Sequence, residues 1–168
     1  MLALALIIVG VVSRTMLHSP NFTPVIAVAL FSGVYLNKKH ATVIPLALMI
    51  ISDVFLGFHD TIVFTWGSLV LISWIGLAIK KNKRFTTIAL ASIVSSILFF
   101  IITNFGAWVS PLYPDTWQGL QECFIAAIPF FRNTFLSTVF YAVLLFGVYE
   151  LTARLVKNTR FARILLAS

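Results

Sequence analysis

Residues 85–108 read FTTIALASIVSSILFFIITNFGAW, a run of 24 residues without a charged side chain. It directly follows the basic stretch KKNKR at positions 80–84. Because roughly 20 apolar residues suffice to cross the hydrocarbon core of a bilayer, this run predicts a membrane-spanning helix. Across all 168 residues, 60% are hydrophobic and only 10% are charged. Soluble domains contain about 25% charged residues, so the composition excludes a soluble enzyme, a disordered regulator and a disulfide-rich secreted domain.

Further apolar stretches occur along the chain, and together they predict six segments. These cover residues 2–17, 23–36, 41–57, 61–79, 85–108 and 119–153. We therefore predict an all-α fold, a bundle of six transmembrane helices forming one integral membrane domain over residues 1–168. The first two segments are short for a span, and the last is too long for one straight span. Pro129 within the last segment predicts a kink or a break. The first segment is interpreted as a retained helix, because no basic residue precedes it as in a signal peptide.

Ten of the 12 lysines and arginines fall in three clusters between or after these segments. They are Lys38 and Lys39; Lys80, Lys81, Lys83 and Arg84; and Arg154, Lys157, Arg160 and Arg163. With six spans, all three clusters fall on one side of the membrane, which the positive-inside rule makes the cytoplasmic side. Both termini are then predicted to be cytoplasmic. Basic clusters of this kind are typical of membrane-protein loops, so no nucleic-acid partner is expected.

Three charged residues lie inside apolar segments: Arg14, Asp53 and Arg132. Each costs about 2.5–3.5 kcal/mol in hydrocarbon, so such side chains usually face the bundle interior, form ion pairs or mark a substrate path. In the six-span arrangement all three belong to the outer half of the membrane. Two interpretations stay open, a structural ion pair of Asp53 with Arg14 or Arg132, and a substrate-binding site.

Other polar and aromatic side chains gather on the same side, in loops that hold no lysine or arginine. Ligand pockets combine apolar and aromatic walls with a few placed polar groups, so we predict one outward-facing, substrate-binding cavity. Its candidate residues are Arg14, His18, Asn21, Asp53, His59, Asn104, Trp108, Tyr113, Glu122, Cys123, Arg132 and Asn133. Trp108 and Tyr113 also fit an aromatic belt at the membrane interface.

Catalytic and metal-binding patterns are absent from the sequence. It contains no HExxH, GxSxG or P-loop motif, so the chain is predicted not to be an enzyme and not to use ATP by itself. Two of the candidates are histidines without a ligand-like spacing, and no metal or other cofactor is predicted. Cys123 is the single cysteine, which excludes an intrachain disulfide, and a buried apolar role is the usual one for such a residue.

Several strings carry a family resemblance: HSPNFTP at 18–24, Ser52-Asp53 followed by Gly57 and His59, TNFGAW at 103–108, and PFFRNT at 129–134. They resemble an uncharacterised family of bacterial membrane proteins described as transport proteins, which is similar to the substrate-binding S-components of energy-coupling factor (ECF) transporters. The resemblance implies a six-helix protein of the bacterial inner membrane, with both termini inside, that binds a vitamin-like nutrient, cobalamin types included, for uptake.

The same resemblance leaves the energising partner open. Many S-components dock a coupling subunit with ATPases through an AxxxA pattern in the first helix. The first segment here has Ala3, Ala5 and Gly10 but no such pair, so docking to an ECF coupling subunit and solitary action both stay open. Some solitary relatives contact cobalt through a cysteine, and that role stays open for Cys123.

Two other classes of function are compatible with the sequence. A structural or assembly subunit of a larger membrane complex predicts apolar outer faces and no ligand-sized cavity. A membrane-embedded enzyme would need a proton-transfer pair, for which Asp53, His59 and Glu122 are the candidates.

Overall fold

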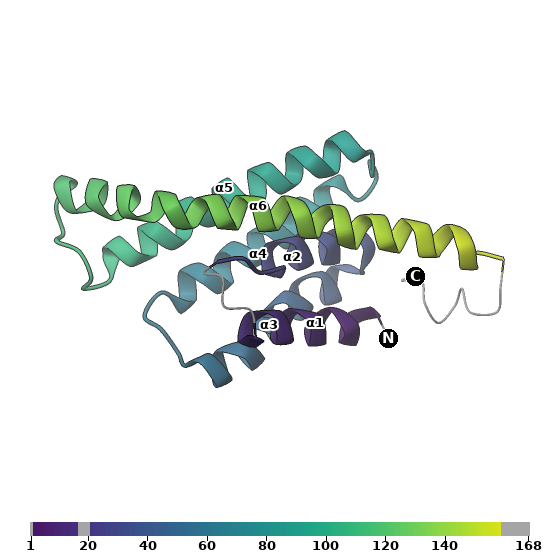
Figure 1. The fold of residues 1–168 in the computed structure, drawn as a ribbon, viewed down its shortest axis with the longest axis horizontal. Helices are drawn as coiled ribbons and strands as arrows, with labels where there is room; N and C mark the ends of the chain where they lie inside the picture. Colours follow the sequence, from purple (N-terminus) through teal and green to yellow (C-terminus); the bar gives the residue numbers. More distant parts are fainter. Residues whose placement is uncertain (1, 17–20, 159–168) are drawn as a thin grey trace.

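The computed structural model describes residues 2–16 and 21–158, and this part of the chain is all-helical, as predicted. The helices are α1 (Leu2–Met16), α2 (Val25–Tyr35), α3 (Lys38–Leu56), α4 (Ile62–Ile79), α5 (Phe85–Val109) and α6 (Trp117–Val156). They alternate in direction along the long axis of the bundle (Figure 1). Each helix lies within a few residues of a predicted segment, because the apolar runs and the polar loops between them are local features of the sequence.

Four helices, α3 to α6, are long and apolar enough to cross a membrane. The other two described helices are shorter, at 15 residues for α1 and 11 for α2. At ~1.5 Å per residue, α2 covers about 17 Å of a hydrocarbon core that is about 30 Å thick. The chain is thus a helical membrane bundle with four candidate spans, and the two further spans remain a prediction.

The short helix α2 forms the centre of the bundle, and all 11 of its residues are buried. A helix that is apolar on every side is expected to be surrounded by others, and α2 packs against α3, α4 and α6. Its closest neighbour is α4, where Gly33 faces Gly76. A Cβ atom added to Gly76 would lie 2.9 Å from the Cα atom of Gly33, so only glycine permits the two backbones to approach this closely.

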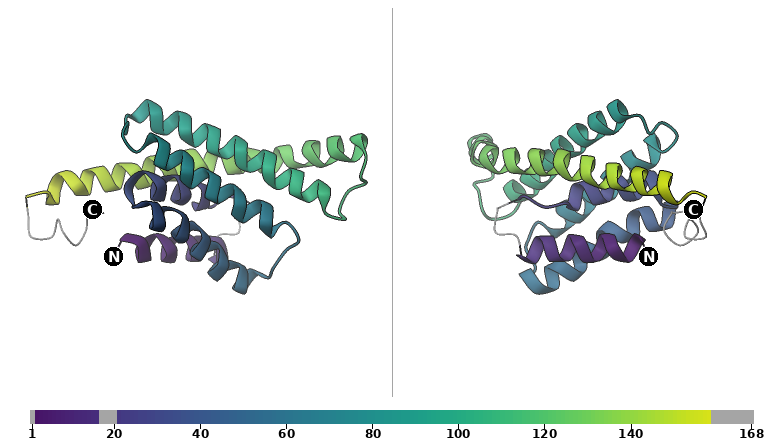
Figure 2. Two further views of the ribbon diagram at one scale, coloured as in Figure 1. Left: turned by 180° about the vertical axis from the view of Figure 1, so that it is seen from behind. Right: turned by 45° about the vertical axis from the view of Figure 1, so that its right-hand side comes forward.

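Helix α6 runs for 40 residues without interruption, so the predicted break at Pro129 is wrong. Pro129 is exposed, and α6 continues through it with one backbone hydrogen bond fewer, because proline has no N–H. At ~1.5 Å per residue, α6 is about 60 Å long, twice the thickness of the hydrocarbon core. It extends beyond the central helices at both ends of the molecule (Figures 1 and 2).

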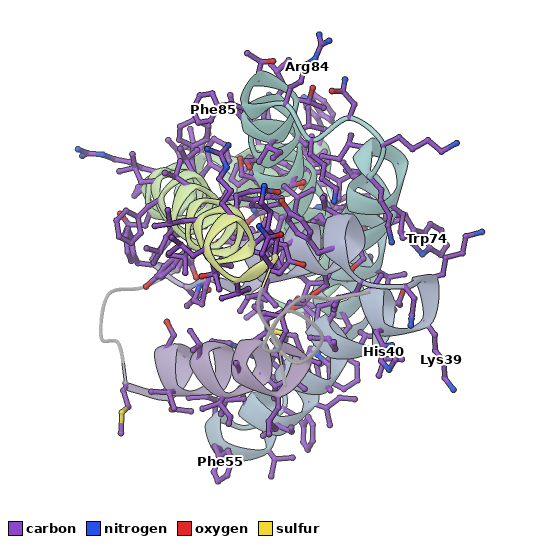
Figure 3. The ribbon with its side chains drawn as sticks, turned by 90° about the vertical axis from the view of Figure 1, so that its right-hand side faces the viewer. Lys39, His40, Phe55, Trp74, Arg84 and Phe85 are labelled. Atoms are coloured by element: carbon purple, nitrogen blue, oxygen red, sulfur yellow. The ribbon has the colours of Figure 1, made fainter. Side chains whose placement is uncertain are left out.

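The basic clusters that the structure describes lie at the same end of the bundle, where Figure 3 labels Lys39 and Arg84. Lys80 at the end of α4 donates a hydrogen bond of 2.7 Å from Nζ to the carbonyl oxygen of Leu36 after α2. Lys83 lies with Nζ 4.3 Å from the ring centroid of Tyr35. The Tyr35 hydroxyl in turn donates to the Glu150 carboxylate of α6. These contacts hold the ends of three helices and the loop between α4 and α5 together at the basic end.

Candidate functional site

A buried ion pair lies in the half of the bundle away from the basic end. Asp53 lies near the end of α3, and its side chain is 1% exposed. Its Oδ1 atom accepts a hydrogen bond of 2.7 Å from Nη1 of Arg14 on α1. Its Oδ2 atom accepts one of 2.9 Å from Nε1 of Trp66 on α4. Because both oxygens have donors, this carboxylate is satisfied inside the protein and connects three helices.

Arg14 is held by side chains of α3 and lines a cavity. Its Nη1 atom also contacts Sδ of Met49 at 3.0 Å and donates to the Ser52 hydroxyl, whose own proton goes to the Leu48 carbonyl oxygen. In the part of the chain that the structure describes, its hydrogen bonds all use Nη1. The side chain is 16% exposed and lines a cavity, and its Nε and Nη2 atoms carry three further N–H donors.

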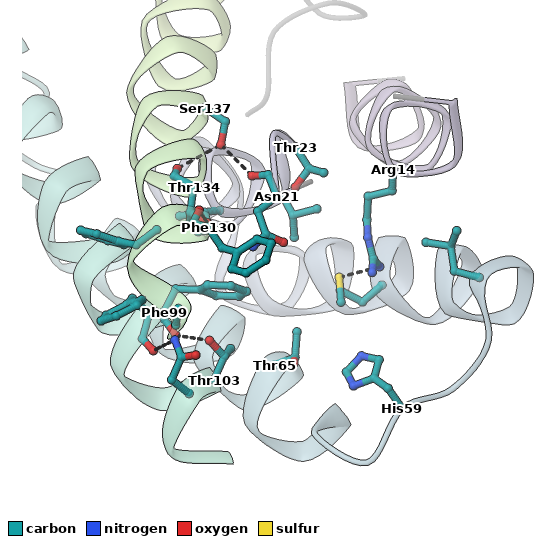
Figure 4. Close-up of a pocket in the computed structure, with 18 residues that line it drawn as sticks. Arg14, Asn21, Thr23, His59, Thr65, Phe99, Thr103, Phe130, Thr134 and Ser137 are labelled. Carbon is teal, nitrogen blue, oxygen red and sulfur yellow. Dashed lines mark hydrogen bonds between the residues drawn. The ribbon is translucent and has the colours of Figure 1, made fainter. Parts of the chain in front are cut away.

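A cavity of about 470 Å³ opens beside Arg14. Its size lies within the range of small-molecule sites, about 300–1,000 Å³. Parts of all six helices or their connecting segments line it, and Figure 4 shows Arg14 and His59 on one side with Phe99 and Phe130 on the other. The lining residues come from the half of the bundle opposite the basic clusters, because each helix contributes its end away from those clusters, or the middle of α6.

Four hydroxyl groups of the polar lining donate their protons to carbonyl oxygens within the protein. Thr65, Thr103 and Thr134 each donate to the carbonyl oxygen four residues earlier, at 3.1, 2.8 and 3.1 Å. Ser137 donates to the carbonyl oxygens of Thr134 and Asn21, at 3.0 and 3.3 Å. Such hydroxyls keep lone pairs but no free proton, so they offer acceptors to a bound molecule.

The wall across from Arg14 and His59 is aromatic (Figure 4). Four phenylalanines from two helices line it: Phe99 and Phe100 on α5, and Phe130 and Phe131 on α6. The rings of Phe100 and Phe131 pack with centroids 4.7 Å apart. The cavity therefore combines one cation, several hydroxyl acceptors and an aromatic wall, which suits an amphipathic molecule that carries a ring.

Asn21 and Thr23, in the segment before α2, form part of the cavity lining. Asn21 adopts a left-handed backbone conformation with φ of 59°, which asparagine tolerates better than most residues. Thr23, Val25 and Ile26 follow it along the lining. The N-terminus of α2 lies at the cavity end of the bundle. Pro24 precedes it, and no side chain in the described part of the chain caps the helix. The N–H groups of its first turn therefore have no capping partner and point toward this end.

Four of the predicted candidates line this cavity, namely Arg14, Asn21, His59 and Asn104. Asp53 lies directly behind Arg14 and holds it. Of the two ion pairs that the sequence left open, the structure contains the one between Arg14 and Asp53. His59 bonds through Nδ1 to the Thr61 hydroxyl at 2.8 Å, which leaves Nε2 for another partner.

Arg132 is exposed, so the expectation that it faces the bundle interior is wrong. It lies two residues from both Phe130 and Thr134, which line the cavity. At 3.6 residues per turn, two residues correspond to about 200°, so its side chain leaves the opposite face of α6. Asn133, beside it, is half-buried, has contacts of its own and is outside the lining.

The remaining candidates lie beyond the cavity, where the end of α5 and the start of α6 project together. The indole N–H of Trp108 donates to the Pro114 carbonyl oxygen at 3.1 Å. Glu122 is exposed and accepts from Gln118 at 2.9 Å. Tyr113 is half-buried in the intervening loop, and Cys123 is buried with its thiol 3.3 Å from the Asn104 carbonyl oxygen. None of these four lines the cavity, and His18 falls outside the described residues.

Sequence reasoning missed the aromatic wall and the hydroxyl row. The doublets Phe99-Phe100 and Phe130-Phe131 look like any lipid-facing pair, since a hydrophobic run carries no mark of which side faces a cavity. The spacing of Thr134 and Ser137 behind the second doublet is a usable signal, because residues three apart share a helix face. Among the described residues, no group of three histidines, cysteines or carboxylates could hold a metal ion.

The fold and the cavity together define a helical membrane bundle with a ligand-sized polar and aromatic site. The sequence model of a family of unknown function (DUF6580) matches residues 1–160, and the chain belongs to this family. Comparison with curated proteins and with solved structures finds no match.

Proposed function

We propose that this protein is a membrane transport protein that binds a small nutrient in the cavity beside Arg14 for uptake. The cavity itself is the observation that carries the proposal. It has the volume of a small-molecule site, and it combines Arg14, His59 and Asn104 with an aromatic wall. A structural or assembly subunit has no need of such a cavity, and packing normally fills protein interiors.

The distribution of charge favours a cavity that opens to the outside of the cell. The basic clusters lie at the opposite end of the bundle, and the positive-inside rule assigns such an end to the cytoplasm. In this orientation α1 and α2 complete six spans, with the non-helical residues 21–24 continuing the short α2 along the cavity. Irregular backbone at membrane depth is tolerated where it lines a cavity.

The resemblance to S-components suggests how uptake is energised. The proposal includes docking to an ECF coupling subunit with ATPases, or uptake by the protein alone. A vitamin-like ligand is compatible with the volume and with the mixture of polar and aromatic walls.

The test is native mass spectrometry of the detergent-purified protein, with a variant that fills the cavity. Ala127 lines the cavity and is 9% exposed, whereas Ala126 beside it is exposed. We expect the unmodified protein and Ala126→Phe to retain a co-purifying small molecule, and Ala127→Phe to lose it. The molecule is then tested for uptake into vesicles that contain the protein. If no small molecule binds any of the three proteins, or if Ala127→Phe binds it unchanged, the proposal is wrong.

A further inference from the structure

We infer that the ligand of this cavity is a small planar-ring compound with a single carboxylate, bound with the carboxylate on the free edge of Arg14 and the ring against the phenylalanine wall. This inference rests on the proposed function and specifies its ligand class. The charge, the hydrogen-bonding groups and the aromatic side chains of the lining each restrict the ligand.

The charge of the lining selects a monoanion. Arg14 is the one lysine or arginine among the described lining residues, and no carboxylate lies among them. The Nη1 side of Arg14 is occupied by Asp53 at 2.7 Å, and its Nε and Nη2 atoms form the edge that binds a carboxylate with two parallel hydrogen bonds. The first-turn amides of α2 add partial positive charge nearby. The Arg14–Asp53 pair is neutral as a whole, so a carboxylate adds one excess negative charge to the site, whereas a phosphate with a charge near −2 adds almost two and is less well matched.

The hydroxyl row requires hydrogen-bond donors on the other part of the molecule. The hydroxyl groups of Thr103, Thr134 and Ser137 donate to backbone carbonyl oxygens, so in this arrangement they offer their lone pairs as acceptors. Asn104 donates through Nδ2 to the Phe100 carbonyl oxygen at 2.7 Å, which leaves its Oδ1 atom as a further acceptor and its second Nδ2 proton as a donor. A ring N–H, amine or hydroxyl on the ligand would satisfy them, whereas a second anionic group would be repelled by these lone pairs.

The aromatic wall selects a ring. Phe99, Phe100, Phe130 and Phe131 lie across the cavity from Arg14 and His59 (Figure 4). Aromatic rings pack on one another in offset or edge-to-face geometry with more free energy than their buried area alone supplies. A planar ring placed between Arg14 and this wall would touch apolar carbon on one face and keep its polar substituents toward the hydroxyl row.

The experiment compares three matched probes by isothermal titration calorimetry on the detergent-purified full chain. Indole-3-acetate carries the ring, the ring N–H and the carboxylate; indole-3-acetamide lacks the charge; naphthalene-1-acetate lacks the ring N–H. We expect indole-3-acetate to bind about tenfold more tightly than the amide, because hydrogen bonds to charged groups are the stronger ones, and more tightly than naphthalene-1-acetate. Inorganic phosphate is the fourth probe and is expected to bind more weakly than indole-3-acetate.

A second readout reports on Arg14 directly. Trp66 bonds to the same carboxylate as Arg14, so occupation of the free Arg14 edge should shift the indole N–H resonance of Trp66 in a sample labelled with ¹⁵N-tryptophan. Trp66→Phe identifies this resonance. Arg14→Lys keeps a positive charge beside Asp53 but removes the two-donor edge, and it should reduce the preference for carboxylate over amide to below about threefold. It is paired with Arg14→Gln/Asp53→Asn, which has no buried charge to strand and should show no carboxylate preference.

The outcomes separate this inference from the proposed function. Equal or tighter binding of the amide, tighter binding of phosphate, no measurable binding of any probe, or a co-purifying molecule that is neutral or cationic would overturn the inference. The last of these results would still support a ligand-binding transport protein. Absence of any co-purifying molecule, or a co-purifying molecule that Ala127→Phe retains unchanged, would overturn the proposed function instead.

Discussion

Replacing Arg14 by glutamine removes the charge partner of a carboxylate that water cannot reach. The Asp53 side chain is 1% exposed, whereas the Arg14 side chain is 16% exposed at the edge of the cavity. Removal of one partner from a buried ion pair typically costs about 3–5 kcal/mol, because the other charge stays buried without compensation. We therefore expect Arg14→Gln to lower the free energy of unfolding by about 3 kcal/mol, the low end of this range, since glutamine can still donate one hydrogen bond.

The opposite change should cost less. In Asp53→Asn the amide oxygen can still accept from Trp66, and the unpaired Arg14 can take water from the cavity. Loss of a hydrogen bond to a charged group costs about 1.5–3 kcal/mol, and we expect a value near 1.5. In the double variant no charge is stranded, so its total cost should be smaller than the sum by about 1–2 kcal/mol, a typical coupling energy for residues in contact.

The assay is reversible unfolding in mixed micelles of dodecyl maltoside and sodium dodecyl sulfate, followed by far-ultraviolet circular dichroism. Arg154→Gln is the matched control, because it is the same substitution at an exposed arginine in the last turn of α6, outside the apolar part of the bundle, and its effect should stay within about 0.5 kcal/mol. The reasoning would be refuted if Arg14→Gln cost no more than the control, if Asp53→Asn cost more than Arg14→Gln, or if the two single costs simply added.

Three further predictions concern the rest of the bundle. Gly76→Ala should lower the free energy of unfolding by about 2–3 kcal/mol in the same assay, because the added Cβ meets the backbone of α2. Gly67→Ala on the same helix is the control: its Cβ meets nothing within 4 Å, so it should be neutral or stabilise by up to about 1 kcal/mol. Equal effects of the two substitutions would contradict this prediction. Tyr35→Phe should cost about 1–2 kcal/mol through loss of the bond to Glu150, and an unchanged unfolding curve would argue against that bond. Asn82→Cys, in a background without the native cysteine, should react with a membrane-impermeant maleimide only after the cells are permeabilised, and labelling of intact cells would reverse the proposed orientation.

The sequence by itself determined where the helices of this protein lie along the chain and that its environment is a lipid bilayer. A chain with 60% hydrophobic and 10% charged residues cannot cover a surface in water, and its apolar runs predicted every helix to within a few residues. The basic clusters predicted one positively charged end of the bundle. Successive helices run in opposite directions, so every second connection, and with it each basic cluster, falls at the same end. Each of these conclusions depends on local composition, which lipid and water select segment by segment.

The sequence also indicated part of the site. Arg14 and Asp53 stood out because a charge inside an apolar segment needs a partner or a cavity, and Asn21, His59 and Asn104 lie along the same cavity. These residues could be found because hydrocarbon makes each buried polar group expensive.

Only the tertiary structure decided which charges pair and which faces meet. Arg14 and Arg132 were equal candidates for Asp53, and the helical phase of α6 turns Arg132 outward while α1 brings Arg14 within 2.7 Å. The burial of the whole of α2 and the placement of Phe99-Phe100 opposite Phe130-Phe131 likewise depend on contacts between distant segments. A run of apolar residues looks the same whether it faces lipid, a neighbouring helix or a cavity, because all three environments accept the same side chains. The rotation of each helix about its own axis, which distinguishes them, is fixed by packing against the other helices.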